Sequence, residues 1–202
     1  MSSISSPRAA AAARLAFAAA AFALSTPAFA AGGTVKGKVE STPPKYLEDT
    51  VVYLKEVPGT YPKKTHPYDQ KGMRFLPHVI TITVGDTVDF LNNDNLVHNV
   101  YSSDAEGYNL GSFKQGEKRT YTFEKQGVYG QLCSIHPEMQ GFIFVGQNPY
   151  ASAVDKKGAF EIKDVPPGSY KLSVWNSHLK ASDKPVTVAA GKAVEESFSL
   201  KR

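Results

Sequence analysis

Residues 133–139 read Cys-Ser-Ile-His-Pro-Glu-Met, and they hold the chain's only cysteine, one of its five histidines and one of its three methionines. A thiolate, an imidazole and a thioether this close together are three of the four donors of a mononuclear type 1 copper site. In such a site two histidines and a cysteine lie roughly in a plane, and a weak methionine sits on the axis. The fourth donor must come from elsewhere in the chain, and His98 is the best candidate.

The C-x-x-H-x-x-M spacing allows one compact loop to present three side chains to one ion. Cys133 follows the apolar run 127–132, so we expect it at the end of a β-strand, with Gly141 closing the loop before the next strand. His98 lies on a separate expected strand, 35 positions before Cys133. Asn99 and the backbone amides of the loop are candidates for hydrogen bonds around the ligands.

Other readings of the Cys-His-Met cluster fit less well. A structural zinc site normally has four strong nitrogen or sulfur ligands, and methionine is a poor zinc ligand. A catalytic Cys–His pair usually comes from distant parts of a sequence and needs no methionine three residues beyond the histidine. His66, His78 and His178 lack such company, and we expect them to be surface or hydrogen-bonded histidines.

The first thirty residues have the features of a secretory signal peptide. Arg8 and Arg14 form a positive segment, residues 15–24 are an apolar run too short to span a bilayer, and Ala28-Phe29-Ala30 is a small-x-small cleavage site. We expect cleavage near Ala30/Ala31 and export to the periplasm. No later stretch is apolar for long enough to span a membrane.

Charge and cysteine content limit the possible partners. Removing the signal peptide takes the formal net charge from +4 to +2, which is too small and too evenly spread to favour nucleic acid. A single cysteine cannot form an internal disulfide. A free thiol in an oxidising compartment is a liability unless something occupies it, and a metal ion would do so.

Alternation with a period of two residues recurs along the mature chain, and no stretch shows a convincing helical period. The alternation predicts about a dozen short strands, too many for one β-sandwich and more comfortable in two. Residues 59–71, rich in Pro, Lys and Tyr, are predicted to be a connecting loop. The predicted strands lie around residues 35–39, 50–57, 80–84, 88–90, 96–102, 121–123, 128–132, 142–144, 160–162, 170–174, 186–188 and 198–200.

Residues 79–145 contain every candidate ligand, and the segments on either side are too short to fold alone. We therefore expect the two flanks to form one domain, with the copper-binding domain inserted between two of its strands. The predicted division is a signal peptide at 1–30, the first part of the flanking sandwich at 31–60, the copper domain at 61–148, and the remainder of the flanking sandwich at 149–202.

Three segments together resemble the cupredoxins, in particular their plastocyanin- and amicyanin-like members. They are V-G-D-T-V-D-F-L-N at 84–92, D-N-L-V-H-N at 94–99 and C-S-I-H-P-E-M at 133–139. The resemblance implies a Greek-key β-sandwich and one type 1 copper ion. By position, the implied ligands are His98, Cys133, His136 and Met139.

The loop resembles the short amicyanin type, because only two residues separate His136 from Met139. It departs from many cupredoxins at Ile135, where they have proline; here Pro137 follows the histidine instead. The family's role implies an electron carrier, not an enzyme, that exchanges single electrons with a redox protein such as a cytochrome or a dehydrogenase.

The flanks resemble a second family, the carboxypeptidase-regulatory, transthyretin-like β-sandwich. The resemblance rests on residues 33–39, 51–54 and the G-A-F…P-P-G-S-Y-K-L segment at 158–172. The order of the pieces also resembles exported bacterial proteins described as methylamine-utilisation-like. Such a flanking module supports a fold assignment and no chemistry of its own.

The function hypothesis is a periplasmic type 1 copper protein that carries electrons. The alternatives are a copper carrier or buffer with the same ligands, and a structural β-module with a vestigial cluster. Phe113, Pro137 and Phe142 are candidates for an apolar patch around the metal that excludes water and offers a docking surface. The sequence names neither the redox partner nor an oligomeric state.

Overall fold

The computed structural model describes residues 31–105 and 107–202, which are almost entirely β-structure. The predicted signal peptide at 1–30 lies outside the described residues. Within the described part, one short 3-10 helix, η1 (Pro44–Asp49), interrupts the strands, and no helix is long and apolar enough to cross a membrane. The all-β fold class predicted from the sequence is confirmed.

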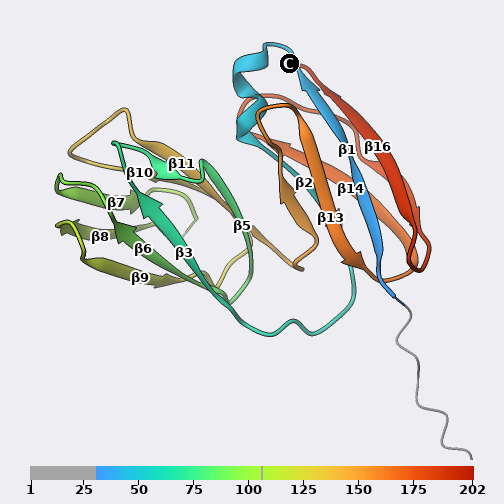
Figure 1. Cartoon of the computed structure of the whole chain (residues 1–202), viewed down its shortest axis with the longest axis horizontal. Helices are drawn as coiled ribbons and strands as arrows, with labels where there is room; N and C mark the ends of the chain where they lie inside the picture. Colours follow the sequence, from blue (N-terminus) through green and yellow to red (C-terminus); the bar gives the residue numbers. More distant parts are fainter. Residues whose placement is uncertain (1–30, 106) are drawn as a thin grey trace, which may run out of the picture.

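Two sheets form what we call the flanking sandwich, with strand orders β13-β1-β16 and β12-β2-β14-β15 (Figure 1). Its strands come from both ends of the described chain, and β1 pairs in parallel with β16. Their bounds are β1 (Gly33–Ser41), β2 (Thr50–Lys55), β12 (Ala151–Ala153), β13 (Ala159–Val165), β14 (Gly168–Asn176), β15 (Lys184–Val188) and β16 (Ala193–Leu200).

Two further sheets form the inserted sandwich, with strand orders β5-β11-β10-β7-β8 and β4-β3-β6-β9. Every one of these strands lies between β2 and β12 in the sequence. Their bounds are β3 (Thr65–Gln70), β4 (Phe75–Leu76), β5 (Val79–Thr83), β6 (Thr87–Asn92), β7 (His98–Ser102), β8 (Tyr108–Phe113), β9 (Lys118–Thr122), β10 (Gly127–Leu132) and β11 (Gln140–Gly146).

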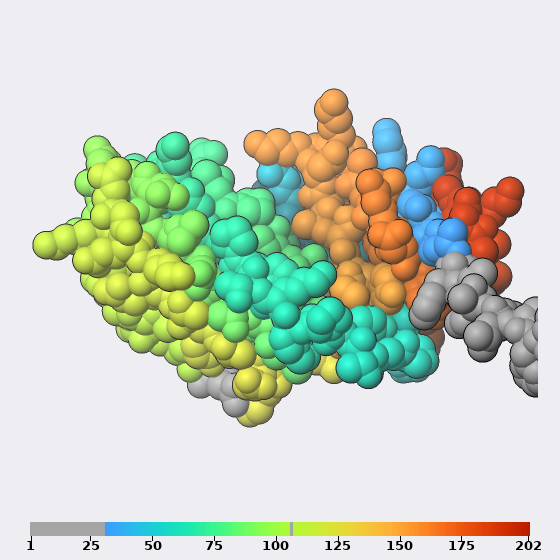
Figure 2. All heavy atoms as spheres, turned by 60° about the horizontal axis from the view of Figure 1, so that its bottom comes forward, coloured from blue at the N-terminus to red at the C-terminus, as the bar shows by residue number. Residues whose placement is uncertain are grey.

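The chain therefore crosses twice between the sandwiches, once after β2 and once before β12. Figure 2 shows the two lobes side by side, with the teal segment that follows β2 running along one face from the flanking to the inserted sandwich. Buried Asn148 ties the two crossings together. Its Nδ2 donates to the carbonyl of Leu54 at 2.9 Å, and its Oδ1 accepts from the backbone N–H of Tyr150 at 3.0 Å.

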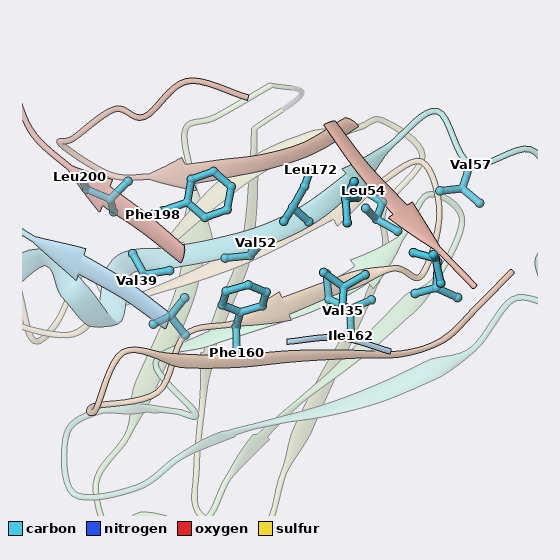
Figure 3. Packing of buried hydrophobic residues seen from close by; sticks show 14 of the residues in the cluster. Val35, Val39, Val52, Leu54, Val57, Phe160, Ile162, Leu172, Phe198 and Leu200 are labelled. Atoms are coloured by element: carbon cyan, nitrogen blue, oxygen red, sulfur yellow. The ribbon is translucent and has the colours of Figure 1, made fainter. Parts of the chain in front are cut away.

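Each sandwich has its own apolar core, built from the inward side chains of alternating strands. In the flanking sandwich, Phe160 and Phe198 face Val52, Leu54 and Leu172 across the space between the sheets (Figure 3). Each fully buried side chain of this kind contributes about 1.5–3 kcal/mol relative to an exposed one. The inserted sandwich has a separate cluster that contains both sulfur ligands predicted from the sequence.

A third apolar cluster joins the sandwiches, and β11 explains how. Ile143 and Val145 face the core of the inserted sandwich, whereas Phe142 and Phe144 face the flanking sandwich, where Tyr53 lies 4.8 Å from Phe144 between ring centroids. A strand buried on both faces reads as a continuous apolar run, as the Phe-Ile-Phe-Val sequence of β11 does.

A partly buried carboxylate, Asp49, also links the two sandwiches. His78 Nε2 lies 2.7 Å from Asp49 Oδ1, and Ser177 donates to the other oxygen of Asp49. Burial raises the pKa of Asp49, but the hydrogen bonds from His78 and Ser177 outweigh it and hold that pKa below its usual value. The Asp49 contact in turn raises the pKa of His78.

The prediction of a connecting loop at 59–71 is wrong for half of its length. Strand β3 (Thr65–Gln70) lies there, paired in parallel with β6, and it buries Tyr68 and Gln70. Only two of its side chains are buried, so the alternation is too short to recognise. Pro67 within the strand also argued against it, because proline cannot donate to a sheet ladder.

Candidate metal centre

The four predicted ligands lie where strands end at one pole of the inserted sandwich. His98 is the first residue of β7, and Cys133 directly follows β10. Strands β7 and β10 are neighbours in one sheet. His136 and Met139 lie on the loop between β10 and β11. The antiparallel pairing of these strands therefore brings residues 35 positions apart to the same pole.

The structure brings three of the predicted ligands together. His98 Nδ1 lies 3.0 Å from His136 Nδ1, and Cys133 Sγ lies 3.8 Å from His136 Nδ1. The ligand atoms of all three residues fall within 4.8 Å of one another. Nitrogen and sulfur ligands bonded to one ion at about 2.0–2.3 Å lie roughly 3–4 Å apart. The spacing and the donor types therefore fit a single N/S-bound metal ion such as copper.

Met139 lies on the same loop as His136 and is buried. It belongs to the same buried cluster as Cys133, and its backbone N–H donates to the carbonyl of His136 at 3.0 Å. This hydrogen bond closes the turn of the loop and holds Met139 next to the ligand histidine. The Met139 side chain is therefore buried in the same apolar cluster as Cys133, which is compatible with an axial thioether in a type 1 site.

Burial differs sharply between the predicted ligands. His98, Cys133 and Met139 have exposed fractions of 0%, 2% and 1%. The side chain of His136 is only partly buried. Of the four, His136 is thus the one that reaches the surface.

Asn99 is hydrogen-bonded both to the sulfur of Cys133 and to the loop that follows it. Its backbone N–H donates to Cys133 Sγ at 3.3 Å, and its side-chain Oδ1 accepts from the backbone N–H of Ser134 at 3.2 Å. Its Nδ2 donates to Asn109 Oδ1 at 2.8 Å. The sequence predicted Asn99 near the ligands, and the structure confirms that contact. An N–H donor to the sulfur stabilises thiolate character and tunes a bound metal.

Asp94 is a contact of the site that the sequence did not predict. Its Oδ2 lies 3.0 Å from His98 Nε2, the ring nitrogen that points away from His136. The same oxygen accepts from the backbone N–H of Met73 at 2.8 Å. The Met73 hydrogen bond, followed by the contact with His98, lowers the pKa of Asp94 below its ordinary value. The only sequence signal was the spacing of an acid four residues before a ligand histidine.

Of the three residues considered for an apolar surface around the metal, only Pro137 is exposed, directly after His136. Phe113 and Phe142 are 1% and 8% exposed, so they are core residues and offer no docking surface. Among the described residues, five large apolar side chains are 40–45% exposed: Met73, Leu76, Leu96, Val97 and Ile135. Of these, Leu96–Val97 directly precede His98, Ile135 directly precedes His136, and Met73 bonds Asp94. We call these four residues the apolar patch.

Comparison with known families agrees with the geometry of the site. Residues 63–146 match the family model described as copper binding proteins of the plastocyanin/azurin family. This segment is thus similar to the copper-binding domains of that family. It contains His98, Cys133, His136 and Met139. A second model, polysaccharide lyase family 4 domain II, matches residues 146–196. The transthyretin-like and methylamine-utilisation-like resemblances stay predictions.

Similar solved structures are cupredoxins and a larger copper enzyme. A purple cupredoxin from Nitrosopumilus maritimus shares 28% identity over 40% of this chain and 99% of its own, with a TM-score of 0.38. A reduced amicyanin mutant shares 26% sequence identity over 40% of this chain and 81% of its own, also with a TM-score of 0.38. The Cu-containing nitrite reductase (NirK) from Thermus scotoductus SA-01 shares 31% sequence identity over 46% of this chain and 24% of its own, with a TM-score of 0.38. Likenesses this partial do not bear on function. No curated protein sequence matches the chain.

Proposed function

We propose that this protein is a periplasmic electron carrier with one type 1 copper ion, held by His98, Cys133 and His136 with Met139 on the axis. The observation that carries the proposal is the convergence of two imidazole nitrogens and one thiol within 4.8 Å at the ends of strands. Copper bound there would supply a reversible one-electron couple.

Hydrogen bonds and burial within the protein hold the three side chains in this arrangement, and an electron carrier needs ligands that are held in place. His98 is fully buried, Cys133 is hydrogen-bonded by Asn99, and the Met139 N–H closes the loop onto His136. Preorganised ligands move little when the charge at the site changes by one. A small rearrangement keeps the barrier to electron transfer low.

Electrons would enter and leave through His136, the ligand that reaches the surface. The residues of the apolar patch are exposed: Leu96–Val97 precede His98, Ile135 precedes His136, and the backbone of Met73 donates to Asp94. An exposed apolar patch of this kind marks a protein-docking surface. The partner would be a redox protein, a cytochrome or a dehydrogenase, that places its own redox group against this patch.

Electrochemistry of the copper-loaded protein tests electron carriage against copper carriage. An electron carrier gives fast, reversible one-electron waves over repeated cycles, and metal analysis afterwards finds one copper per chain. A copper carrier with no role in electron transfer gives slow, irreversible waves, or loses copper over repeated cycles. The matched control is Cys133→Ser, which nearly preserves side-chain size and removes the thiolate.

A further inference from the structure

Asp94 contacts the face of His98 that is turned away from the other donors. Its Oδ2 lies 3.0 Å from His98 Nε2, while His98 Nδ1 lies 3.0 Å from His136 Nδ1. We propose that Asp94 is a positioning residue, which holds the His98 proton on Nε2 and leaves Nδ1 free to bind copper. The proposal rests on the proposed function only for the identity of the metal.

The loop before β7 keeps Asp94 in place. Asn92 Oδ1 accepts from the backbone N–H of Asp94 at 2.9 Å, and Asn92 Nδ2 donates to the carbonyls of Leu96 and Phe113 at 2.9 and 3.0 Å. Met73 donates its backbone N–H to the oxygen that faces His98. Asp94 is 8% exposed and Asn92 1%. The carboxylate is therefore fixed by the fold and independent of any metal.

The chemistry of imidazole makes this contact directional. A neutral ring carries one N–H and one lone pair, and the hydrogen bond made by one nitrogen decides which nitrogen has the lone pair. An ionised carboxylate can only accept, so it selects the tautomer with the proton on Nε2. A carboxylate partner also places negative charge behind the ring, which favours the more highly charged copper(II) over copper(I).

A measurement on the metal-free protein tests this without any variant. Nitrogen-15 NMR at neutral pH identifies which ring nitrogen of His98 carries the proton. We expect Nε2–H and an unprotonated Nδ1. A His98 ring with its proton on Nδ1 would overturn the proposal. Because no copper is needed, this result stands even if the protein turns out not to bind copper at all.

A pair of variants then separates positioning from simple loss of charge. Asp94→Asn keeps the shape but offers an amide N–H to His98 Nε2. Asp69→Asn removes a carboxylate that accepts from Asn93 Nδ2 at 3.0 Å in the same loop region and does not touch the histidine. We expect Asp94→Asn to give a mixture of His98 tautomers and to weaken copper(II) binding about tenfold. If copper(I) binding is unchanged, the reduction potential rises by about 59 mV.

The control should change the copper(II) affinity by less than about twofold and leave the tautomer alone, since no hydrogen bond to a ligand is lost. Equal effects of the two variants on both readouts would mean that Asp94 acts only through its charge, and the positioning role would fall. If Asp94→Asn does not fold, the NMR measurement on the unmodified protein still decides.

Discussion

The Nδ1 atoms of His98 and His136 lie 3.0 Å apart, although the two residues are separated by 38 positions in the sequence. One ring is fully buried and the other is partly open to solvent. The pair therefore combines a fixed inner ligand with an accessible outer one. This difference predicts different responses to removing each ring.

Imidazole added to the solution should compensate for the loss of the outer ring, that of His136. In His136→Gly the ring leaves a gap that opens to the surface, so added imidazole can reach the metal and restore the wild-type absorption spectrum. In His98→Gly the gap is buried, and the same imidazole concentration should restore less than about a tenth of the signal. Titrations of both copper-loaded variants check this. Equal rescue of the two variants would contradict the difference in burial.

The glycine that closes the ligand loop should tolerate no side chain. A Cβ at Gly141 would lie 2.2 Å from the hydroxyl of Tyr68 and 2.8 Å from Cβ of Phe75. Gly141→Ala should therefore destabilise the protein by about 1–3 kcal/mol and shift Met139, two residues away. Urea unfolding and the copper spectrum measure both effects.

Gly130 offers a matched control for that substitution. It lies on the neighbouring strand β10, paired with Phe142, and a Cβ there would come no closer than 3.3 Å to another heavy atom, a side-chain oxygen of Asp104. Gly130→Ala should change the unfolding free energy by less than about 1 kcal/mol. A Gly141→Ala protein as stable as this control would show that the loop has room to move.

The ion pair between the sandwiches should make stability depend on pH. Contact with Asp49 raises the pKa of His78 in the folded protein. The contribution of His78 to folding stability is therefore complete below the ordinary histidine pKa of about 6.5. It is lost as the pH rises through the pKa of His78 in the folded protein. The pKa of Asp49 is lowered, so its contribution is already present at about pH 5.5 and disappears only on further acidification.

The comparison is urea unfolding of the metal-free protein and of His78→Gln, each at about pH 5.5 and pH 8.5. Between these values the wild type should lose up to about 1 kcal/mol more than the variant. The difference between the two proteins cancels the titration of the other histidines and the lost contact with Phe142. The same pH dependence in both would show that folding does not raise the pKa of His78.

Changes in the apolar patch should alter the rate of electron exchange and leave the copper site unchanged. Ile135 is 45% exposed next to His136, so Ile135→Lys should slow electron self-exchange at least about tenfold, because two charged patches must approach each other. The spectrum should not change, since the side chain points to solvent. Ser199→Lys, an exposed position on β16 of the flanking sandwich, adds the same charge elsewhere.

NMR line broadening in mixtures of reduced and oxidised protein gives the self-exchange rate of each variant. Equal slowing by Ser199→Lys would attribute the effect to net charge alone. No slowing by Ile135→Lys would place the electron exit away from His136.

The sequence predicted the site better than its surroundings. The donors could be identified because their chemistry depends on residue type and on a short spacing, C-x-x-H-x-x-M. The convergence of His98 with the loop followed from alternating strands. Asp94 could not be recognised, because an aspartate in a turn of Asn and Asp residues is ordinary until the fold brings its oxygen to the ring of His98.

Other features depended on long-range packing that no local pattern records. Strand β3 was taken for a loop, because only Tyr68 and Gln70 turn inward beside Pro67. The sequence makes Phe113 and Phe142 candidates for a patch around the metal but does not show which way they point. Phe113 instead packs in the core of the inserted sandwich, and Phe142 packs against Trp175 of the flanking sandwich at 5.3 Å between ring centroids.

Addition of copper(II) to the purified, metal-free protein tests the central claim most directly. If His98, Cys133 and His136 hold one copper ion, an intense thiolate-to-copper absorption band appears and saturates at one equivalent. The same titration of Cys133→Ser gives no such band. Absence of the band in the wild-type protein, or its persistence in Cys133→Ser, would contradict the assignment of this pole as a type 1 copper site.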